Sequence, residues 1–245
     1  MSIWGKLIGG AAGFALGGPI GAMVGILLGG SFDKNNKNFI KKNNISQEQK
    51  KNIFAISIII LSAKIAKADG QVTQEEILAF KDKFKIPKSE IKKVSKIFNE
   101  AKNSTIGFKQ IADQVGSLFN DNKILLEELL NNLFYIAESD GKISEEEIEI
   151  LKSISESFNL KDKDFQSIYH ARLNNKKSDP YKVLKAKRTD SDLAVRKKWI
   201  ELSKEHHPDN LISKGLPQEF IDQATKELSS INIAYDRIKI QRGIS

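Results

Sequence analysis

Residues 7–32 constrain the chain most, because they carry no charged side chain. From Leu7 to Phe32 the sequence runs for 26 residues without Asp, Glu, Lys or Arg. A helix needs about 20 apolar residues to cross the hydrocarbon core of a bilayer. The stretch is too apolar for a flexible linker. A cleaved signal peptide is disfavoured because no small-x-small cleavage site is followed by a mature start, and only one basic residue precedes the stretch. We therefore predict an N-terminal anchor over residues 1–32 with a single transmembrane helix.

Glycine recurs at every fourth position of this stretch. Small residues four apart form a ridge along which two helix backbones can approach closely in lipid. The helix tolerates these glycines and Pro19, because a backbone in lipid must satisfy its own hydrogen bonds. We predict self-association to a homodimer through this ridge, while an anchor without pairing is the alternative. The predicted dimerisation residues are Gly9, Gly13, Gly17, Gly21 and Gly25.

Basic residues follow the uncharged stretch directly. The chain has a net charge of +8, and much of the excess lies between residues 31 and 51, where Lys34, Lys37, Lys41, Lys42, Lys50 and Lys51 outnumber Asp33 and Glu48. The positive-inside rule places such a flank in the cytoplasm, where the lysines lie near anionic lipid headgroups. We predict an N-terminus outside, a basic polar tether over residues 33–45, and cytoplasmic domains after it.

Two apolar helices are expected in the middle of the chain. Residues 53–63 are uncharged but too short to span a bilayer, so they predict a buried bundle helix, which Ser46 and Gln49 begin with a capping box. Residues 125–134 predict a second buried helix. Shorter helices are expected at 89–102, 105–118 and 161–172.

Each apolar helix continues into nearly the same sequence, which indicates a duplication. AKADGQVTQEEI covers residues 66–77, and AESDGKISEEEI covers residues 137–148. Thr73 with Glu76, and Ser144 with Glu147, have the spacing of capping boxes, so each copy predicts a helix, a tight turn and a helix. The copies also match the second half of a calcium loop, but the preceding ligand positions lack the carboxylates that calcium needs. The structural turn is therefore favoured over a calcium site.

This pattern resembles the TerB-like, tellurite-resistance helical domain, here over residues 46–173. The resemblance implies a helical bundle. In that family paired acidic residues near these turns are implicated in metal binding, which here would point to Asp69, Glu76, Asp140 and Glu147. We make no firm metal assignment.

After a linker at residues 174–178, the last unit covers residues 179–245. Pro180 opens a short helix, Thr189 is expected to cap a second, and Pro217 is expected to begin a third. The two longer helices predict an antiparallel hairpin. His207-Pro208-Asp209 lies at its loop end, where proline stiffens the backbone.

This turn and the helix before it have the chemistry of a docking surface. The Asp209 carboxylate can bind a partner's guanidinium through two hydrogen bonds. Glu201 and Glu205 interrupt the basic face, which disfavours nucleic-acid binding. We expect His206 to be a surface neighbour of His207 rather than a metal ligand, and Trp199 to pack between helices. The basic side chains that would attract an acidic protein surface are Arg196, Lys197, Lys198 and Lys204.

The motifs D-P-Y-x-V-L, His207-Pro208-Asp209 and Ile231-Asn232-x-Ala234-Tyr235 together resemble the J-domain of DnaJ-type co-chaperones. That resemblance implies docking on a DnaK-type chaperone and stimulation of its ATP hydrolysis. Ile200 and Glu201 depart from the family, where these positions are usually basic. The order of anchor, TerB-like domain and J-domain resembles the membrane-anchored DnaJ-like co-chaperones, which implies the bacterial inner membrane.

The sequence thus predicts an all-α protein: a single transmembrane helix, a TerB-like bundle and a J-domain hairpin. We find no nucleophile–base pair and no phosphate-binding glycine loop, so we predict a co-chaperone that is not an enzyme and needs no cofactor. Its predicted partners are a DnaK-type chaperone, membrane lipid and a second copy of the chain, without nucleic acid. The alternative is a membrane-stress sensor or signalling adaptor with a metal-binding TerB-like domain.

Overall fold

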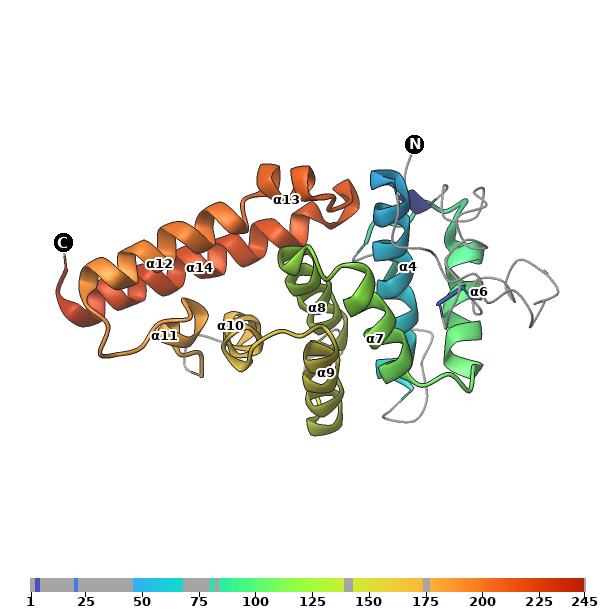
Figure 1. Ribbon diagram of the computed structural model, residues 1–245, viewed down its shortest axis with the longest axis horizontal. Coiled ribbons are helices and arrows are strands. Elements are labelled where there is room, and N and C mark those ends of the chain that lie inside the picture. Colours follow the sequence, from blue (N-terminus) through green and yellow to red (C-terminus); the bar gives the residue numbers. More distant parts are fainter. Residues whose placement is uncertain are drawn as a thin grey trace.

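The computed structural model describes residues 3–4, 20–21, 46–67, 80–81, 84–138, 143–173 and 177–244. All regular structure in these residues is helical, which confirms the predicted all-α fold for them. Figure 1 shows a helical bundle to which a long C-terminal hairpin is joined. The helices are α4 (Gln47–Ala66), α6 (Ile91–Asn103), α7 (Phe108–Leu118), α8 (Lys123–Ala137), α9 (Glu145–Ser157), α10 (Asp162–Arg172), α11 (Pro180–Val183), α12 (Asp192–Glu205), α13 (Pro208–Lys214), η2 (Gln218–Phe220) and α14 (Ile221–Arg242).

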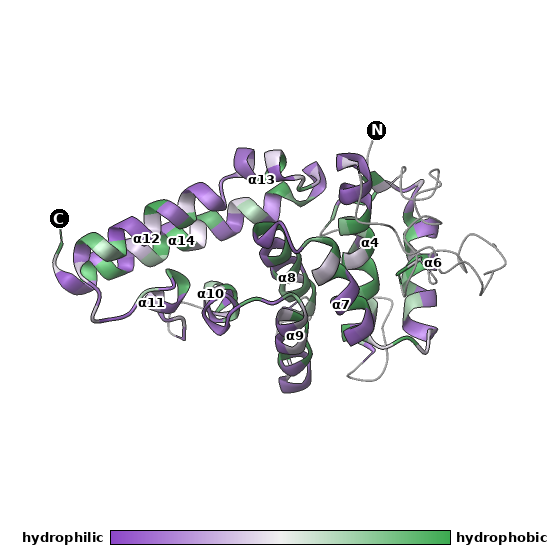
Figure 2. Ribbon diagram, viewed as in Figure 1, coloured by the Kyte–Doolittle hydropathy of each residue, from purple (hydrophilic) through white to green (hydrophobic). Residues whose placement is uncertain are grey.

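Helix α4 forms the centre of the bundle. Ser46 and Gln49 make the predicted capping box, since each side chain accepts a hydrogen bond from the other residue's backbone N–H. Every residue from Asn52 to Ala66 is buried, and the middle of the helix is correspondingly apolar in Figure 2. A helix that is apolar all round needs neighbours on every side. Helices α6, α7, α8 and α9 all contact it.

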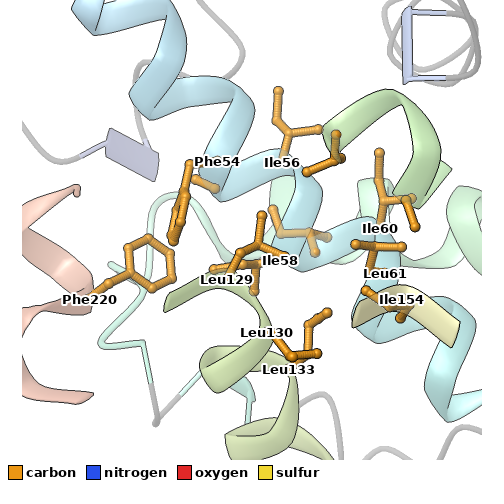
Figure 3. Close-up of a cluster of buried hydrophobic side chains, with 14 of the residues drawn as sticks. Phe54, Ile56, Ile58, Ile60, Leu61, Leu129, Leu130, Leu133, Ile154 and Phe220 are labelled. Atoms are coloured by element: carbon orange, nitrogen blue, oxygen red, sulfur yellow. The ribbon is translucent and has the colours of Figure 1, made fainter. Parts of the chain in front are cut away.

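Helix α8 is the second buried helix that the sequence predicts. Figure 3 shows Leu129, Leu130 and Leu133 of this helix lying close to Ile58 and Leu61 of α4. Helix α9 begins at Ser144 with the predicted capping box to Glu147. The first copy of the duplicated turn lies outside the described residues, except at its start.

The C-terminal unit is the predicted antiparallel hairpin, with α12 and α14 side by side (Figure 1). One predicted start was wrong: the N-cap of α12 is Ser191, not Thr189, because the Ser191 hydroxyl accepts the N–H of Ala194 at 3.2 Å. Pro217 precedes the η2 turn, and α14 begins at Ile221. Helix α13, directly after the hairpin turn, was not predicted.

The loop end of this hairpin is part of the bundle's core. Leu211, Leu216, Phe220 and Ala224 are buried in the same apolar cluster as α4 and α8. In Figure 3 the ring of Phe220 faces that of Phe54, with centroids 5.2 Å apart. The far end of the hairpin has its own small core, formed by Tyr181, Val183, Leu184, Val195, Leu202, Ile231, Ala234 and Ile238.

The described residues of the N-terminal region pack on this bundle. Trp4 is fully buried, with its ring centroid 5.8 Å from that of Phe220, and the N–H of Ile20 donates to Gln114 Oε1 at 2.8 Å. Within the parts of the chain that the structure describes, we find no helix both long and apolar enough to cross a bilayer. The predicted anchor and tether otherwise lie outside those parts, as do Gly9, Gly13, Gly17 and Gly25; Gly21 is described and is buried.

Candidate functional site

The turn His207-Pro208-Asp209 lies between two helices that fix its backbone. His206 is the C-cap of helix α12, and His207 is the N-cap of α13, which has Pro208 in its first turn. The Nδ1 of His207 accepts the N–H of Asp209 at 3.3 Å. Proline suits this position because the first N–H groups of a helix have no partner within it. The sequence therefore folds here into a stiff corner.

The polar groups of this corner face solvent. The side chain of His207 is 54% exposed and that of Asp209 is 89% exposed, with His207 Nδ1 and Asp209 Oδ2 3.8 Å apart. An exposed carboxylate at a rigid turn is available to a guanidinium or an ammonium group of another protein. The corner can therefore act as a point of contact for a partner.

The four basic side chains of α12 differ in their surroundings. Arg196, Lys197 and Lys204 are exposed, although Lys197 lies 3.9 Å from Glu201 in an i, i+4 pair. Lys198 instead turns toward the start of the unit, where its Nζ lies 2.7 Å from Asp190 Oδ2. The structure thus leaves three of the four predicted residues open to a partner.

A shallow apolar depression lies beside the turn, and the sequence reasoning missed it. It has a volume of about 390 Å³ and is lined by Trp199, Ile200, Ser203, Lys204 and His207. Ile200 therefore contributes an apolar wall where the resemblance led us to expect a basic residue. The i, i+3, i+4 spacing of these residues along α12 was the available signal.

Trp199 packs between the hairpin helices, as predicted. Its ring stacks on Tyr235 of α14 with centroids 4.3 Å apart and an interplanar angle of 3°. The indole Nε1 donates to Asn232 Oδ1 at 2.8 Å. This pair fixes one wall of the depression.

The prediction for His206 was wrong, since its side chain is only 2% exposed. It lies in a buried carboxylate cluster where the hairpin meets α8: Nδ1 is 3.0 Å from Glu128 Oε1 and 3.9 Å from Glu227 Oε1, while Nε2 is 3.5 Å from Glu127 Oε2. Burial alone would lower the pKa of His206, but the carboxylates of Glu227, Glu127 and Glu128 raise it well above 6.5. The imidazolium form therefore links the hairpin to the bundle electrostatically.

Burial and the nearby Glu128 carboxylate raise the pKa of Glu227 to about 7. For Glu127, burial would also raise the pKa, but hydrogen bonding to His206 and the charge of Lys185 lower it strongly. The pKa values of Glu227 and Glu127 thus shift in opposite directions although both side chains are buried, because the Lys185 ammonium contacts Glu127 directly.

The acidic residues implied by the TerB resemblance are only partly described. Asp69, Glu76 and Asp140 lie outside the described residues. Glu147 is 6% exposed, and its Oε2 accepts the N–H of Ser144 at 2.9 Å and its hydroxyl at 3.1 Å. Its carboxylate therefore serves the helix cap.

Comparison with known proteins finds similarity in two regions of the chain and over nearly its whole length. Residues 55–170 match the family model of the tellurite resistance protein TerB, and residues 1–50 match that of the co-chaperone DjlA transmembrane domain. A protein of Photobacterium profundum named Co-chaperone protein DjlA is 26% identical, covering 98% of this chain and 99% of its own.

Proteins of the same name from Coxiella burnetii, at 26% identity over 98% of both chains, and Escherichia coli K12, at 24% over 99% of both, are also similar. No solved structure is significantly similar. The chain is therefore similar to the DjlA co-chaperones over nearly its whole length, and it matches the DjlA transmembrane model and then the TerB model in that order.

Proposed function

We propose that this chain is a membrane co-chaperone whose C-terminal hairpin docks on a DnaK-type chaperone and stimulates its ATP hydrolysis. The observation that carries the proposal is the exposed His207-Pro208-Asp209 corner at the end of a basic helix. The names of the full-length relatives support it. In this proposal the chain regulates the ATPase of another protein and catalyses no reaction itself.

The partner surface would be acidic and carry a cation for Asp209. Arg196, Lys197 and Lys204 would steer such a surface toward α12, because charged patches raise association rates more than affinity. The corner would then place Asp209 against a guanidinium of the chaperone.

The test is ATP turnover by a DnaK-type chaperone with the full chain in lipid nanodiscs. The full chain is needed because Leu211, Leu216 and Phe220 of the C-terminal unit are buried in the bundle core. Turnover should rise with the wild-type chain, while His207→Gln and Asp209→Asn should abolish the rise. The matched control is Asp236→Asn, which removes another exposed carboxylate of the hairpin, on α14. An unchanged turnover with the wild-type chain would refute the proposal.

We further propose that residues 1–32 anchor the chain in the bacterial inner membrane, with the N-terminus outside and the later domains cytoplasmic. The uncharged stretch, its lysine-rich flank and the DjlA transmembrane match support this. In this proposal Trp4 and Ile20 exchange the contacts that they make with the bundle for contacts in the bilayer. The chain has no cysteine, so a single cysteine introduced at Ser2 or at Ser31 is the only thiol. A thiol label added from one side of the membrane then shows on which side that position lies. Labelling of Ser2→Cys from outside and of Ser31→Cys from inside is expected. Equal labelling of both from the cytoplasmic side would contradict the anchor.

Pairing through the glycine ridge would place two docking corners at one spot and raise their local concentration. Replacement of Gly13, Gly17 and Gly21 by leucine should preserve membrane insertion but remove crosslinked dimers, because leucine prevents the close approach of two helix backbones. If dimers persist in this variant, the glycines do not mediate pairing.

A further inference from the structure

Three buried side chains from three helices converge where the hairpin meets the bundle. Glu128 lies on α8, His206 is the C-cap of α12, and Glu227 lies on α14. Each offers one ligand atom, and these atoms lie within 4.8 Å of one another. Among the residues that the structure describes, this is the only such group of three or more.

The distances from His206 to the two carboxylates bracket the ligand spacing of a tetrahedral metal site. His206 Nδ1 lies 3.0 Å from Glu128 Oε1 and 3.9 Å from Glu227 Oε1. Ligands about 2.0–2.1 Å from a tetrahedral zinc ion are about 3.3 Å apart. Because all three atoms lie within 4.8 Å of one another, side-chain movements of at most about 1.5 Å would bring them to the spacing of zinc ligands.

Glu128 provides an independent sign of a missing partner. Its side chain is fully buried, and its second carboxylate oxygen, Oε2, has no hydrogen-bond partner within the described residues. A buried carboxylate oxygen without a partner is costly. A cation bound by Glu128 would satisfy it.

The surroundings of His206 are those of a metal-bound imidazole. While Nδ1 faces Glu128 and Glu227, Nε2 faces Glu127 Oε2 at 3.5 Å. Metal-bound histidines commonly donate their other N–H to a carboxylate, which fixes the ring. Glu127 is itself held by Lys185 Nζ at 3.0 Å.

Glu227 is oriented in the same manner. Its Oε2 accepts a hydrogen bond from the amide of Asn131, and Asn131 Oδ1 accepts one from Arg172 Nε at 3.0 Å. A polar cavity of about 250 Å³ lies against Glu227 and is also lined by Asn131, Arg172 and Gln223. An ion would therefore approach the site from the side of Glu227, the one proposed ligand that borders this cavity, which also has room for a water.

We infer that Glu128, His206 and Glu227 form a binding site for a divalent transition metal of the zinc class, which would join the C-terminal hairpin to the bundle. One imidazole nitrogen with two carboxylates favours zinc over calcium or magnesium, which prefer sets of oxygen ligands. Binding of the ion would displace the proton from Nδ1 of His206. Two carboxylates and the resulting neutral imidazole cancel the charge of a divalent ion, which suits a buried site.

The test is zinc binding to the full, tag-free chain in detergent after chelator treatment, followed by calorimetry. The wild-type chain should bind one zinc ion that magnesium and calcium do not displace. Glu128→Gln and His206→Gln should weaken this binding roughly 100-fold or more, since each removes one of three protein ligands. The control Glu205→Gln alters the exposed neighbour of His206 and should bind as the wild type does.

X-ray absorption keeps the inference testable if a variant loses its fold. The zinc spectrum of the wild-type chain should show one imidazole nitrogen and oxygen ligands at about 2.0–2.2 Å. The inference fails if the folded wild-type chain binds no zinc, if His206→Gln binds it as tightly, or if the spectrum shows two imidazoles. None of these measurements uses the chaperone, so they are independent of the proposed co-chaperone function.

Discussion

Asp164 shows at the residue scale how the structure uses buried charge. Its side chain is 0% exposed, and it lies 2.8 Å from the Nζ of Lys123 and 2.8 Å from that of Lys185. Burial alone would raise the pKa of Asp164, but hydrogen bonds from these two lysines lower it below 3.8, against an opposing effect of Glu127. Asp164 is thus ionised in the folded protein.

This arrangement predicts a pH-dependent contribution to stability. Because the folded-state pKa of Asp164 is depressed, its stabilisation is present above the unfolded-state pKa near 3.8 and is lost as the pH falls further. Asp164→Asn should therefore lower the free energy of unfolding by roughly 3 kcal/mol at pH 7, with a smaller loss at pH 3. Urea unfolding at both pH values measures this. Asp162→Asn, at an exposed position in the same turn, should change little, and an equal loss at both pH values would contradict the prediction.

Lys198 and Lys204 should differ in function although both belong to α12. Lys204 is exposed beside the turn, so Lys204→Ala should slow association with the chaperone roughly threefold at low salt and less at high salt. Lys198 is bound to Asp190 and to the carbonyl of Lys185, so Lys198→Ala should lower the free energy of unfolding by about 1 kcal/mol and change association less. Stopped-flow binding and urea unfolding compare them. Equal effects of both substitutions on association would argue against this division.

At the element scale, Gly116 controls how α7 packs on α9. A Cβ atom at this position would lie 2.3 Å from the backbone oxygen of Ser157. Gly116→Ala should therefore lower the free energy of unfolding by about 1–2 kcal/mol, because backbone must move, although alanine favours the helix. Thermal unfolding measures the loss. Ser117→Ala, at the next and exposed position, should have an effect within about 0.5 kcal/mol. A stabilised Gly116→Ala variant would show that the two helices can separate without cost.

The helices were predictable where the signals are local. The capping boxes at Ser46 and Ser144 depend on residues three apart, and the structure has both. The start of α12 was missed because Thr189, Asp190 and Ser191 are all good caps. Contacts decided among them: Asp190 accepts the N–H of Lys187 and binds Lys198, which leaves Ser191 as the cap. The sequence does carry a signal for helix α13. Pro208 marks the start of this helix and Gly215, with a φ of +103°, marks its end.

At the scale of the whole molecule, Phe220 joins the two units. Its ring lies 5.2 Å from Phe54 and 5.0 Å from Phe84 between ring centroids. Phe220→Ala should lower the free energy of unfolding by about 3–5 kcal/mol and increase hydrogen exchange in α4 as well as in α14. Leu193→Ala, at a side chain that is 79% exposed on the hairpin, is the control and should change neither. If exchange rises in α14 alone, the bundle core does not depend on the hairpin.

The sequence by itself determined the long helices, where the charge lies and which motifs the chain carries, because periodicity, capping and charge order are properties of neighbouring residues. Only the tertiary structure decided that His206 is buried while His207 is exposed. Their sequence signals are nearly the same, but Glu128, which contacts His206, lies 78 positions away. The energy of a buried charge depends on all the groups around it, whatever their place in the chain. The carboxylate cluster beneath the turn therefore appeared only when α8, α12 and α14 were packed together.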